Sequence, residues 1–313
     1  MAEASDLISV LIVTRDREAL FQRALESVVD QTYRPIEIVV IDNASVTPLQ
    51  IDPDLHDVPI RVVRRASPAN ASVTRNEAAH YAKGSLIAYL DDDDFYFPEK
   101  LALQASALRR NPNVDFCTGT VEIRYPDKTI ESSVASVKDL ETLLLHRPVH
   151  LNGLLIRKPT FDAVQFNEQM DKYVDVQMVT RLYRDFRGIV VPDTVAVWLV
   201  DNRPDQITNT SLLNRLSTLG RQARNWKCLC EEFASLIDQS ADLRRLYYRK
   251  QAALSFLTFN LKDAFFYAGA AVGIWGGNQR SDKSPKGVES AALINAPLSS
   301  TAVKPPRAFQ SNQ

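Results

Sequence analysis

Residues 85–101 read SLIAYLDDDDFYFPEKL, and this stretch decides how the rest of the chain is interpreted. The apolar run 86–90 has the length and composition of a buried strand, and it ends abruptly in four aspartates at 91–94. Aromatic residues follow, and then Pro98, which suits the first turn of a helix. We therefore expect the acidic run on a solvent-facing loop at the carboxyl end of a strand, where open α/β sheets bind ligands.

Four adjacent carboxylates repel one another, so the run needs either solvent or a cation. One interpretation is an ordinary solvated loop between a strand and a helix. The other is a site for a hard divalent cation, which takes oxygen ligands and commonly holds substrate phosphates. The buried strand before the run and the proline after it favour the cation site. An EF-hand is excluded, because the loop lacks the required Gly and the terminal Glu.

The bulk properties exclude several classes of protein. The chain has 313 residues, of which 45% are hydrophobic, so it suffices for one large domain or two smaller ones. A net charge of −1 gives no indication of a nucleic-acid partner. Cys117, Cys228 and Cys230 have neither disulfide nor zinc spacing, which is typical of a reducing compartment. The start, MAEASDLIS, is no signal peptide, and no apolar stretch is long enough to span a bilayer.

Strand and helix patterns alternate over roughly the first 110 residues, which predicts an α/β fold with a doubly wound sheet covered on both faces. The helix from Thr74 is expected to begin with a capping box to Glu77 and to end at Gly84. The expected strands are 7–13, 36–41, 60–63 and 86–90, and the expected helices are 17–30, 74–84 and 98–110.

Polar residues follow three of these strands: Thr14 the first, Asp42 and Asn43 the second, and the aspartates the fourth. Parallel strands bring such ends to one edge of the sheet, where a nucleotide cleft is expected. Each residue also has a structural interpretation: Thr14 and Asp42 can cap turns or helices, and Arg75 can be a solvated side chain of a first helical turn.

After residue 110 the pattern becomes mixed. Expected strands are 114–124, 151–157, 189–191 and 195–199, and expected helices are 139–146 and one that follows Asp175 and ends at Gly188. Residues 211–268 are mostly helical in pattern, and 278–313 are predicted to be disordered. The segment FFYAGAAVGIWGG at 265–277 either packs on the core or forms a surface for membrane or partner contact.

Several common motifs are absent from the sequence. It contains no GxxxxGK[ST], no GxGxxG and no GxSxG, and its four histidines form no metal-ligand pattern. These absences argue against a P-loop protein, a dinucleotide-binding Rossmann domain and an α/β-hydrolase.

Four segments together resemble family 2 glycosyltransferases. ISVLIVTRDRE (8–18) resembles the opening of that family, and IEIVVIDNAS (36–45) its second-strand motif. TRNEAAHYAKGSLIAYLDDDDFYFPEKL (74–101) resembles its RN, A-x-G, LDxDD and P-x-x-L series, which includes the metal-binding DxD motif. DKYVDVQMVTRL (171–182) resembles the helix start that carries the family's catalytic base. The resemblance runs from about Ile8 to Leu199 and leaves the C-terminal part uncovered.

The resemblance implies a glycosyltransferase-A fold and a metal-dependent inverting transfer. The donor would be a nucleotide diphosphate sugar (UDP- or dTDP-linked), the cofactor Mn or Mg, and the acceptor a hydroxyl of a glycan or glycolipid. Carried over position by position, the site residues would be Thr14, Asp42 and Asn43 for base and ribose, Arg75 near the nucleotide, Asp91 and Asp92 for ribose and metal, Asp93 as direct metal ligand, and Asp175 as catalytic base. We expect Asp175 to be ionised at neutral pH, because the helix after it offers free N–H groups. Asp171 is the rival candidate for the base. The purely structural alternative is that Asp175 only caps the helix.

The chain departs from the family pattern in three places. Arg15 and Asp16 replace a Tyr-Asn pair, and Val174 stands where the family has the first acid of its pair. The family's His after the last strand is missing, which leaves Arg203 as a candidate contact to the pyrophosphate.

The resemblance also divides the chain and suggests its context. Residues 1–205 would form the catalytic domain, with a nucleotide-sugar-binding half (1–110) and an acceptor half (111–205), followed by a helical extension (206–277) and a disordered tail (278–313). The expected context is polysaccharide or glycoconjugate assembly in the cytoplasm or peripherally at the inner face of the membrane, with membrane or protein contact through the C-terminal helices. The rivals are a catalytically silent sugar-nucleotide-binding or scaffold protein of the same fold and a nucleotidyltransferase, although the latter typically needs a Gly-rich phosphate loop.

Overall fold

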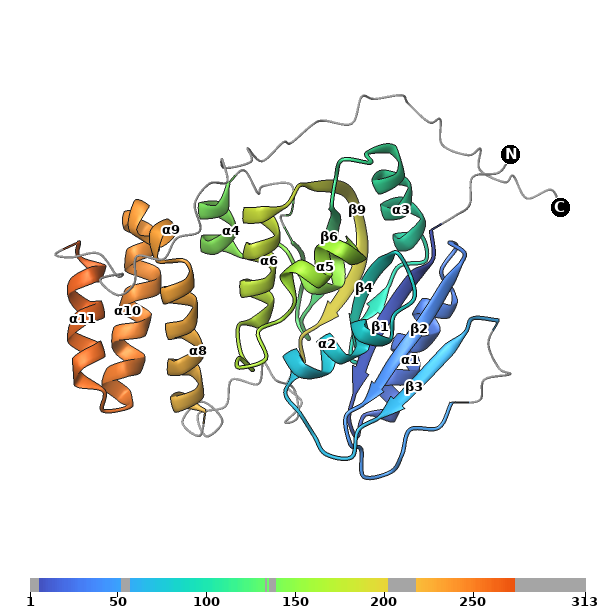
Figure 1. The fold of residues 1–313 in the computed structure, drawn as a ribbon, viewed down its shortest axis with the longest axis horizontal. Helices are drawn as coiled ribbons and strands as arrows, with labels where there is room; N and C mark the ends of the chain where they lie inside the picture. Colours follow the sequence, from blue (N-terminus) through green and yellow to red (C-terminus); the bar gives the residue numbers. More distant parts are fainter. Residues whose placement is uncertain (1–5, 52–56, 133, 135–138, 202–217, 274–313) are drawn as a thin grey trace.

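The computed structural model describes residues 6–51, 57–132, 134, 139–201 and 218–273. A single twisted sheet stands between layers of helices, and a group of C-terminal helices lies beside it (Figure 1). The strand order is β3-β2-β1-β4-β8-β6-β9-β5, and β7 pairs with β6. The strands are β1 (Ile8–Thr14), β2 (Ile36–Asp42), β3 (Ile60–Arg64), β4 (Leu86–Asp91), β5 (Phe95–Tyr96), β6 (Phe116–Arg124), β7 (Thr129–Glu131), β8 (Leu154–Arg157) and β9 (Gly188–Leu199).

The helices agree broadly with the periodicity of the sequence. They are α1 (Glu18–Val29), α2 (Ala71–Tyr81), α3 (Lys100–Arg110), α4 (Leu140–His146), the 3₁₀ turn η3 (Leu151–Gly153), α5 (Lys158–Val164), α6 (Val174–Asp185), α8 (Leu219–Glu232), α9 (Ala234–Gln239), α10 (Ala241–Leu257) and α11 (Leu261–Ala271). The predicted α/β class is confirmed.

The first four strands are parallel and bring their carboxyl ends together. The register sets Thr14 at the end of β1 opposite Asp42 of β2, and Val13 opposite Asp91 of β4. The side chains of β1, β2 and β4 are almost all buried, because helices cover both faces of a parallel sheet. The polar strand ends therefore share one edge, as the sequence predicts.

Helix α2 begins earlier than its predicted capping box. Asn70 is the N-cap, and its side chain accepts a hydrogen bond from the amide of Val73 at 3.0 Å. Thr74 lies inside the helix, so the box to Glu77 is wrong. Gly84 is also no helix cap, since α2 ends at Tyr81; a Cβ there would lie 2.5 Å from the carbonyl oxygen of Leu7, so this glycine lets the chain pass close to the entry of β1.

The second half of the sheet is mixed. β8 runs antiparallel to β4 and β6, whereas β9 runs parallel to β6. The two strands predicted at 189–191 and 195–199 are one strand, β9, which continues through Pro192 with register shifts beside Gly119 and Thr120. Residues 151–153 form the 3₁₀ turn instead of strand.

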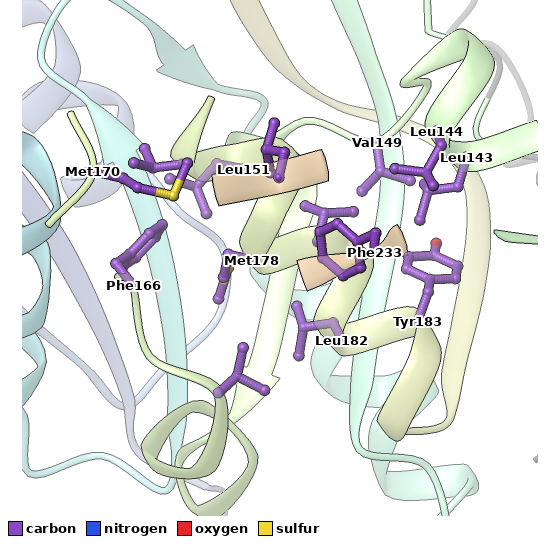
Figure 2. Packing of buried hydrophobic residues seen from close by; sticks show 14 of the residues in the cluster. Leu143, Leu144, Val149, Leu151, Phe166, Met170, Met178, Leu182, Tyr183 and Phe233 are labelled. Atoms are coloured by element: carbon purple, nitrogen blue, oxygen red, sulfur yellow. The ribbon is translucent and has the colours of Figure 1, made fainter. Parts of the chain in front are cut away.

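The hydrophobic core extends beyond the sheet into the C-terminal helices. One buried cluster runs from Leu11 in β1 to Trp226 in α8 and Tyr247 in α10. Figure 2 shows side chains of α4 and α6 directed toward one another and toward Phe233, which lies between α8 and α9. The catalytic part predicted at 1–205 and the C-terminal helices therefore share a core.

Three further expectations concern membrane-spanning helices, the cysteines and two regions of the C-terminal half. No helix in the described ranges combines the length and the hydrophobicity that crossing a membrane requires. Cys117, Cys228 and Cys230 are all free thiols. The tail predicted to be disordered at 278–313 and Arg203 lie outside the described residues.

Candidate functional site

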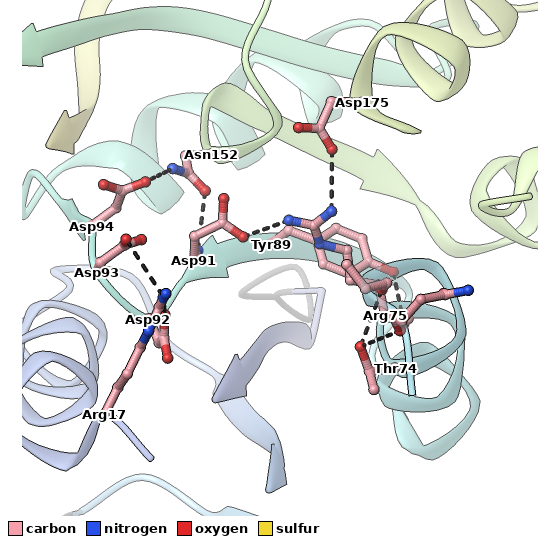
Figure 3. Close-up of polar contacts among 12 residues, drawn as sticks. Arg17, Thr74, Arg75, Tyr89, Asp91, Asp92, Asp93, Asp94, Asn152 and Asp175 are labelled. Carbon is pink, nitrogen blue, oxygen red and sulfur yellow. Dashed lines mark hydrogen bonds and ion pairs between the residues drawn. The ribbon is translucent and has the colours of Figure 1, made fainter. Parts of the chain in front are cut away.

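The acidic residues 91–94 form a tight turn between β4 and β5. The amide of Asp94 donates to the carbonyl oxygen of Asp91 at 3.1 Å, and the amide of Asp91 donates to the side chain of Asn152 at 3.2 Å. Asp91 is directed toward Arg75 and Asp94 toward Asn152, whereas Asp92 and Asp93 share Arg17 (Figure 3). These cationic and hydrogen-bonding partners reduce the repulsion among the four carboxylates.

Asp92 is buried and connects the turn after β4 to the end of β1 and the start of α1. Thr14 Oγ1 donates to one of its carboxylate oxygens at 2.8 Å, and Arg17 Nη1 lies 3.1 Å from the other. Burial raises the pKa of Asp92 to about 6, although Arg17 and Thr14 oppose the rise. Both oxygens thus have partners within the protein, so the expected solvent-facing position is wrong for this residue.

Asp94 is equally buried and joins the turn to the second half of the sheet. Its carboxylate accepts hydrogen bonds from Asn152 Nδ2 at 2.6 Å and from the amide of Leu199 at 2.8 Å. Burial raises its pKa well above the usual value, and the charges of Asp91 and Asp93 raise it further. Asp94 is not among the site residues predicted from the sequence. In the structure it connects the turn to η3 and to the end of β9.

Asp91 is the most exposed of the four acids, and Asp93, whose side chain is 13% exposed, is less buried than Asp92 and Asp94. The Asp91 side chain is 38% exposed and pairs with Arg75 Nη2 at 2.6 Å. Asp93 lies 3.6 Å from Arg17 Nη1, and its carbonyl oxygen accepts a hydrogen bond from Arg23 Nη2 at 2.7 Å. These two carboxylates are therefore the ones that a bound ligand can reach without breaking the buried contacts of Asp92 and Asp94.

The donor set fits a divalent ion that is shared with a ligand. Within the described ranges, no group of three or more His, Cys, Asp or Glu side chains could hold a metal alone. A Mg²⁺ ion usually needs only one or two carboxylates when substrate phosphates complete its coordination. Asp91, paired with Arg75, and Asp93, beside Arg17, supply that number. Asp92 is less suited, because both of its carboxylate oxygens already have buried partners.

Arg75 lies between the two halves of the site. Its guanidinium, on α2, pairs with Asp91 on one side and with Asp175 Oδ1 at 3.2 Å on the other (Figure 3). Burial alone would lower the pKa of Arg75, but the two carboxylates outweigh it and raise the pKa above the usual value. The permanent charge of Arg75 therefore links the acidic turn to the start of α6.

Asp175 lies in the first turn of α6, after Val174, and not before the helix as predicted. Its side chain is 49% exposed. Loss of hydration nevertheless raises its pKa above the usual value, Arg75 opposes the rise and Asp91 adds to it. The end of α6 therefore does not determine the direction of the shift in the pKa of Asp175, and the ionisation of Asp175 at neutral pH stays a prediction.

Asp175 also lines a pocket of ≈ 380 Å³ between α4, α6 and the ends of β6 and β9. The pocket contains apolar side chains together with Arg147, His150 and Trp198. The rings of His150 and Trp198 are 4.9 Å apart, and burial lowers the pKa of His150 to about 4, so this imidazole is neutral at pH 7. Asp175 thus faces Arg75 and also borders a partly aromatic cavity.

The rival base Asp171 is held by the C-terminal helices. Its carboxylate accepts hydrogen bonds from Arg221 Nη1 at 2.9 Å and from Asn225 Nδ2 at 2.5 Å. Tyr173, which has the left-handed φ of 62°, packs its ring edge-on against Trp226 at 4.9 Å. Helix α8 therefore fixes the segment that leads into α6 and sets the position of Asp175.

Asp42 and Asn43 shape the loop that follows β2. The buried carboxylate of Asp42 accepts hydrogen bonds from the amides of Ser45 at 2.9 Å and Leu49 at 3.2 Å. Burial opposes its ionisation, but these bonds and the charge of Arg64 outweigh it and lower the pKa of Asp42. Asn43 and Ala69 exchange two hydrogen bonds of 2.9 Å. Their predicted contact with base and ribose stays a prediction.

Sequence reasoning missed Arg17, Arg23 and Asn152. The two arginines carry a signal in retrospect, because they follow the first strand closely and an acidic run that ends a neighbouring strand needs cations. Asn152 carries none, since no recognised motif surrounds it.

Known structures share this architecture. Staphylococcus aureus TarS (residues 1–349, in complex with UDP-GlcNAc) aligns with a TM-score of 0.53 over 90% of this chain and 99% of that one, at 14% identity. The mannosyltransferase PcManGT of Pyrobaculum calidifontis, in complex with GDP-Man and Mn²⁺, aligns with a TM-score of 0.55 over 87% and 82%, at 18% identity. The fold is therefore that of glycosyltransferases of the A type, as the resemblance implied.

The family assignment comes from the sequence. The model of glycosyl transferase family 2 matches residues 9–172, slightly more than half of the chain, and the protein belongs to this family. An uncharacterized glycosyltransferase of Haemophilus influenzae is 29% identical over 110 residues, which are 35% of this chain and 37% of the relative. The Escherichia coli UDP-Glc:alpha-D-GlcNAc-diphosphoundecaprenol beta-1,3-glucosyltransferase WfgD is 30% identical over 42% of this chain and 52% of the relative. The matched segments thus span between about a third and half of these two proteins.

Proposed function

We propose that the protein transfers a sugar, with inversion and with the help of a divalent metal ion, from a nucleotide diphosphate sugar to a hydroxyl group of a glycan or glycolipid. The observation that carries this proposal is the arrangement around Arg75. A turn with the partly exposed carboxylate of Asp91 and the less exposed carboxylate of Asp93 lies on one side of this arginine, and a half-exposed carboxylate that borders a pocket lies on the other.

The donor would bind at the edge formed by β1, β2 and β4. Thr14, Asp42 and Asn43 would line the nucleoside position, and Asp91 and Asp93 would hold a Mn²⁺ or Mg²⁺ ion together with the diphosphate. When bound, such an ion neutralises the phosphates and stabilises the departing nucleotide. The complexes of TarS with UDP-GlcNAc and of PcManGT with GDP-Man and Mn²⁺ support a nucleotide sugar as the ligand of this edge.

Asp175 would act as the general base. The acceptor oxygen forms a bond to the anomeric carbon, the bond from that carbon to the diphosphate breaks, and the hydroxyl proton passes to the carboxylate of Asp175. Its raised pKa makes it a stronger base than an ordinary aspartate. The ion pair with Arg75 would hold the carboxylate in position and favour its ionised form.

The acceptor would enter the pocket beside Asp175. Trp198 and His150 offer aromatic rings against which a sugar can pack, and Arg147 adds a positive charge to the lining of the pocket. Because two Escherichia coli relatives are named for a diphosphoundecaprenol-linked acceptor, a lipid-linked glycan is the acceptor class that we favour. The corresponding context is polysaccharide or glycoconjugate assembly at the inner face of the membrane.

The test begins with thermal melting in the presence of Mn²⁺ and a panel of nucleotide sugars. Ligand binding at a concentration of 100 times Kd stabilises a protein by about 2.7 kcal/mol, so a true donor gives a clear shift. Release of the nucleoside diphosphate is then measured with and without glycan acceptors, in the wild type and in Asp175→Asn. Stabilisation without release in any combination would favour the silent binding protein, and no stabilisation by any nucleotide sugar would contradict the proposal.

A further inference from the structure

The outermost part of the C-terminal helices is unusually apolar for a surface. Seven of the ten large hydrophobic side chains that are exposed in the described ranges belong to the α10–α11 hairpin. Five of them surround the turn between the two helices, which we call the hairpin tip: Phe256, Leu257, Phe259, Leu261 and Phe265. Phe259 is 89% exposed and has a left-handed φ of 58°, so the turn itself directs an aromatic ring away from the protein.

The hairpin tip is also far from the sheet. Helix α11 is the outermost element of the helical group and packs chiefly on α10 (Figure 1). Its inner face is buried through Tyr267 and Ala270, whereas Leu261, Phe265 and Val272 recur at helical spacing on its outer face. Apolar side chains on a protruding end are costly in water, so the hairpin tip is expected to have a partner.

The charges beside the hairpin tip indicate what kind of partner fits. The segment 241–273 contains five Arg or Lys residues and two Asp residues. One of the two acids, Asp263, is already paired with Lys227 of α8. Arg249 and Lys262 are exposed, and Arg249 lies two turns before Phe256 on the same face of α10. The apolar tip therefore has a cationic border.

We propose that the hairpin tip docks the protein on an anionic lipid surface. Aromatic and aliphatic side chains that enter the boundary between headgroups and acyl chains, with Lys and Arg in contact with the headgroups, are the chemistry of such docking. No helix in the described part of the chain is a candidate for crossing the bilayer, so the protein would lie on the surface. This proposal does not depend on the identity of the donor or acceptor.

Two other occupants fit the charges less well. In a two-fold dimer, the hairpin tips of two copies of the chain would pack against each other, and their two cationic borders would repel one another. Residues 274–313 of this chain contain five Arg or Lys and two acids, so they too would bring positive charge to a positive border. An anionic lipid surface is complementary to both the apolar tip and its border.

The experiment uses the full chain and sedimentation with vesicles of phosphatidylcholine alone or with about a quarter phosphatidylglycerol. We expect binding to the anionic vesicles that weakens with salt, because each Lys or Arg at a membrane surface contributes about fivefold in affinity. Phe256→Ser with Phe259→Ser should weaken binding by at least about tenfold. Arg249→Glu with Lys262→Glu should weaken it by about 25-fold or more.

The matched control is Val46→Ser, because Val46 is a large apolar residue that is 86% exposed in the loop after β2, far from the hairpin. It should bind as the wild type does, and equal melting temperatures of all variants should show that the fold is intact. Absence of wild-type binding, or equal binding of the Phe256→Ser/Phe259→Ser variant, overturns the proposal. A dimer that disappears in that variant identifies a second copy as the occupant, and binding that requires truncation after Gly273 identifies the chain's own tail; either result also overturns it.

Discussion

The acidic turn after β4 and the start of α6 carry the same kind of side chain in opposite states. Within the turn, Asp92 and Asp94 are buried, and β1, α1, η3 and β9 supply their partners. Asp175 is half exposed, pairs with Arg75 and borders a pocket. The comparison shows that contacts within the protein hold the buried carboxylates of the turn in place. The carboxylate at the start of α6, in contrast, can be reached by an incoming molecule. Preorganised and accessible groups are what a two-substrate reaction needs.

The largest expected effect belongs to the accessible side. Asp175→Asn should lower turnover ~10²–10⁴-fold, because the amide cannot accept the proton, and should leave donor affinity nearly unchanged. Single-turnover kinetics and titration calorimetry with the nucleotide measure the two effects separately. Asp171→Asn is the control, since Asp171 is engaged by Arg221 and Asn225; a greater loss of turnover there would reverse the assignment of the base.

The next effect concerns the turn. Asp93→Ala should weaken metal-dependent nucleotide binding by ~10–100-fold or more, because even a supporting partner of a metal ligand is worth that much. The melting temperature should change little, since the buried connections run through Asp92 and Asp94. Nucleotide binding is titrated with and without Mn²⁺, and Asp193→Ala, at an exposed acid on β9, serves as the control. Undiminished Mn²⁺ dependence in Asp93→Ala would locate the metal site elsewhere.

A loss of stability is expected instead at Asp94. Asp94→Ala removes the acceptor of the buried Asn152 Nδ2 and of the part-buried Leu199 amide, so both donors lose this partner. Leaving a buried donor unsatisfied costs about 1–3 kcal/mol, which denaturant unfolding measures directly. If Asp94→Ala is as stable as Asp93→Ala, the distinction between fixed and accessible acids within the turn fails.

The smallest expected effect concerns the influence of Arg75 on the pKa of Asp175. A base works only when it is deprotonated, so turnover should fall as the pH drops through the raised pKa of Asp175. Arg75 stabilises the ionised carboxylate, so Arg75→Gln should raise this pKa further and move the acidic limb of kcat/KM to higher pH. Arg65→Gln, on the same side of the fold but paired with Glu77, should leave the limb in place. If the acidic limb of kcat/KM does not move in Arg75→Gln, Arg75 does not influence the pKa of the group that controls turnover.

The sequence predicts this site only in part, for physical reasons that differ between residues. The strand ends at Thr14, Asp42 and Asp91 could be placed together because apolar runs mark the strands and parallel pairing aligns their ends. Which aspartates of the turn are buried could not be predicted. That depends on Asn152 and Leu199, whose contacts to Asp94 span 58 and 105 positions along the chain.

Local competition explains two further errors. Asn70 and Thr74 both have side chains that cap helices, and the sequence favoured the residue with Glu three positions later, whereas the chain uses the earlier one. Pro192 divided one predicted strand into two, although a proline at an irregular position of a strand is compatible with β9. In both places the tertiary arrangement decided between local signals of similar strength.

The contacts of α8 with α6 have a consequence for recombination. Asp171 pairs with Arg221, Tyr173 packs on Trp226, and Arg181 Nη2 lies 3.0 Å from Glu232. A chimera that exchanged the C-terminal helices at the apparent border near residue 205 would separate all three pairs and disturb the helix that carries Asp175. The family match ends at residue 172, at the start of this interlocked block. Residues 171–273 should therefore be inherited, or grafted, as one unit, so that a new set of C-terminal helices arrives together with its own counterpart of Asp175.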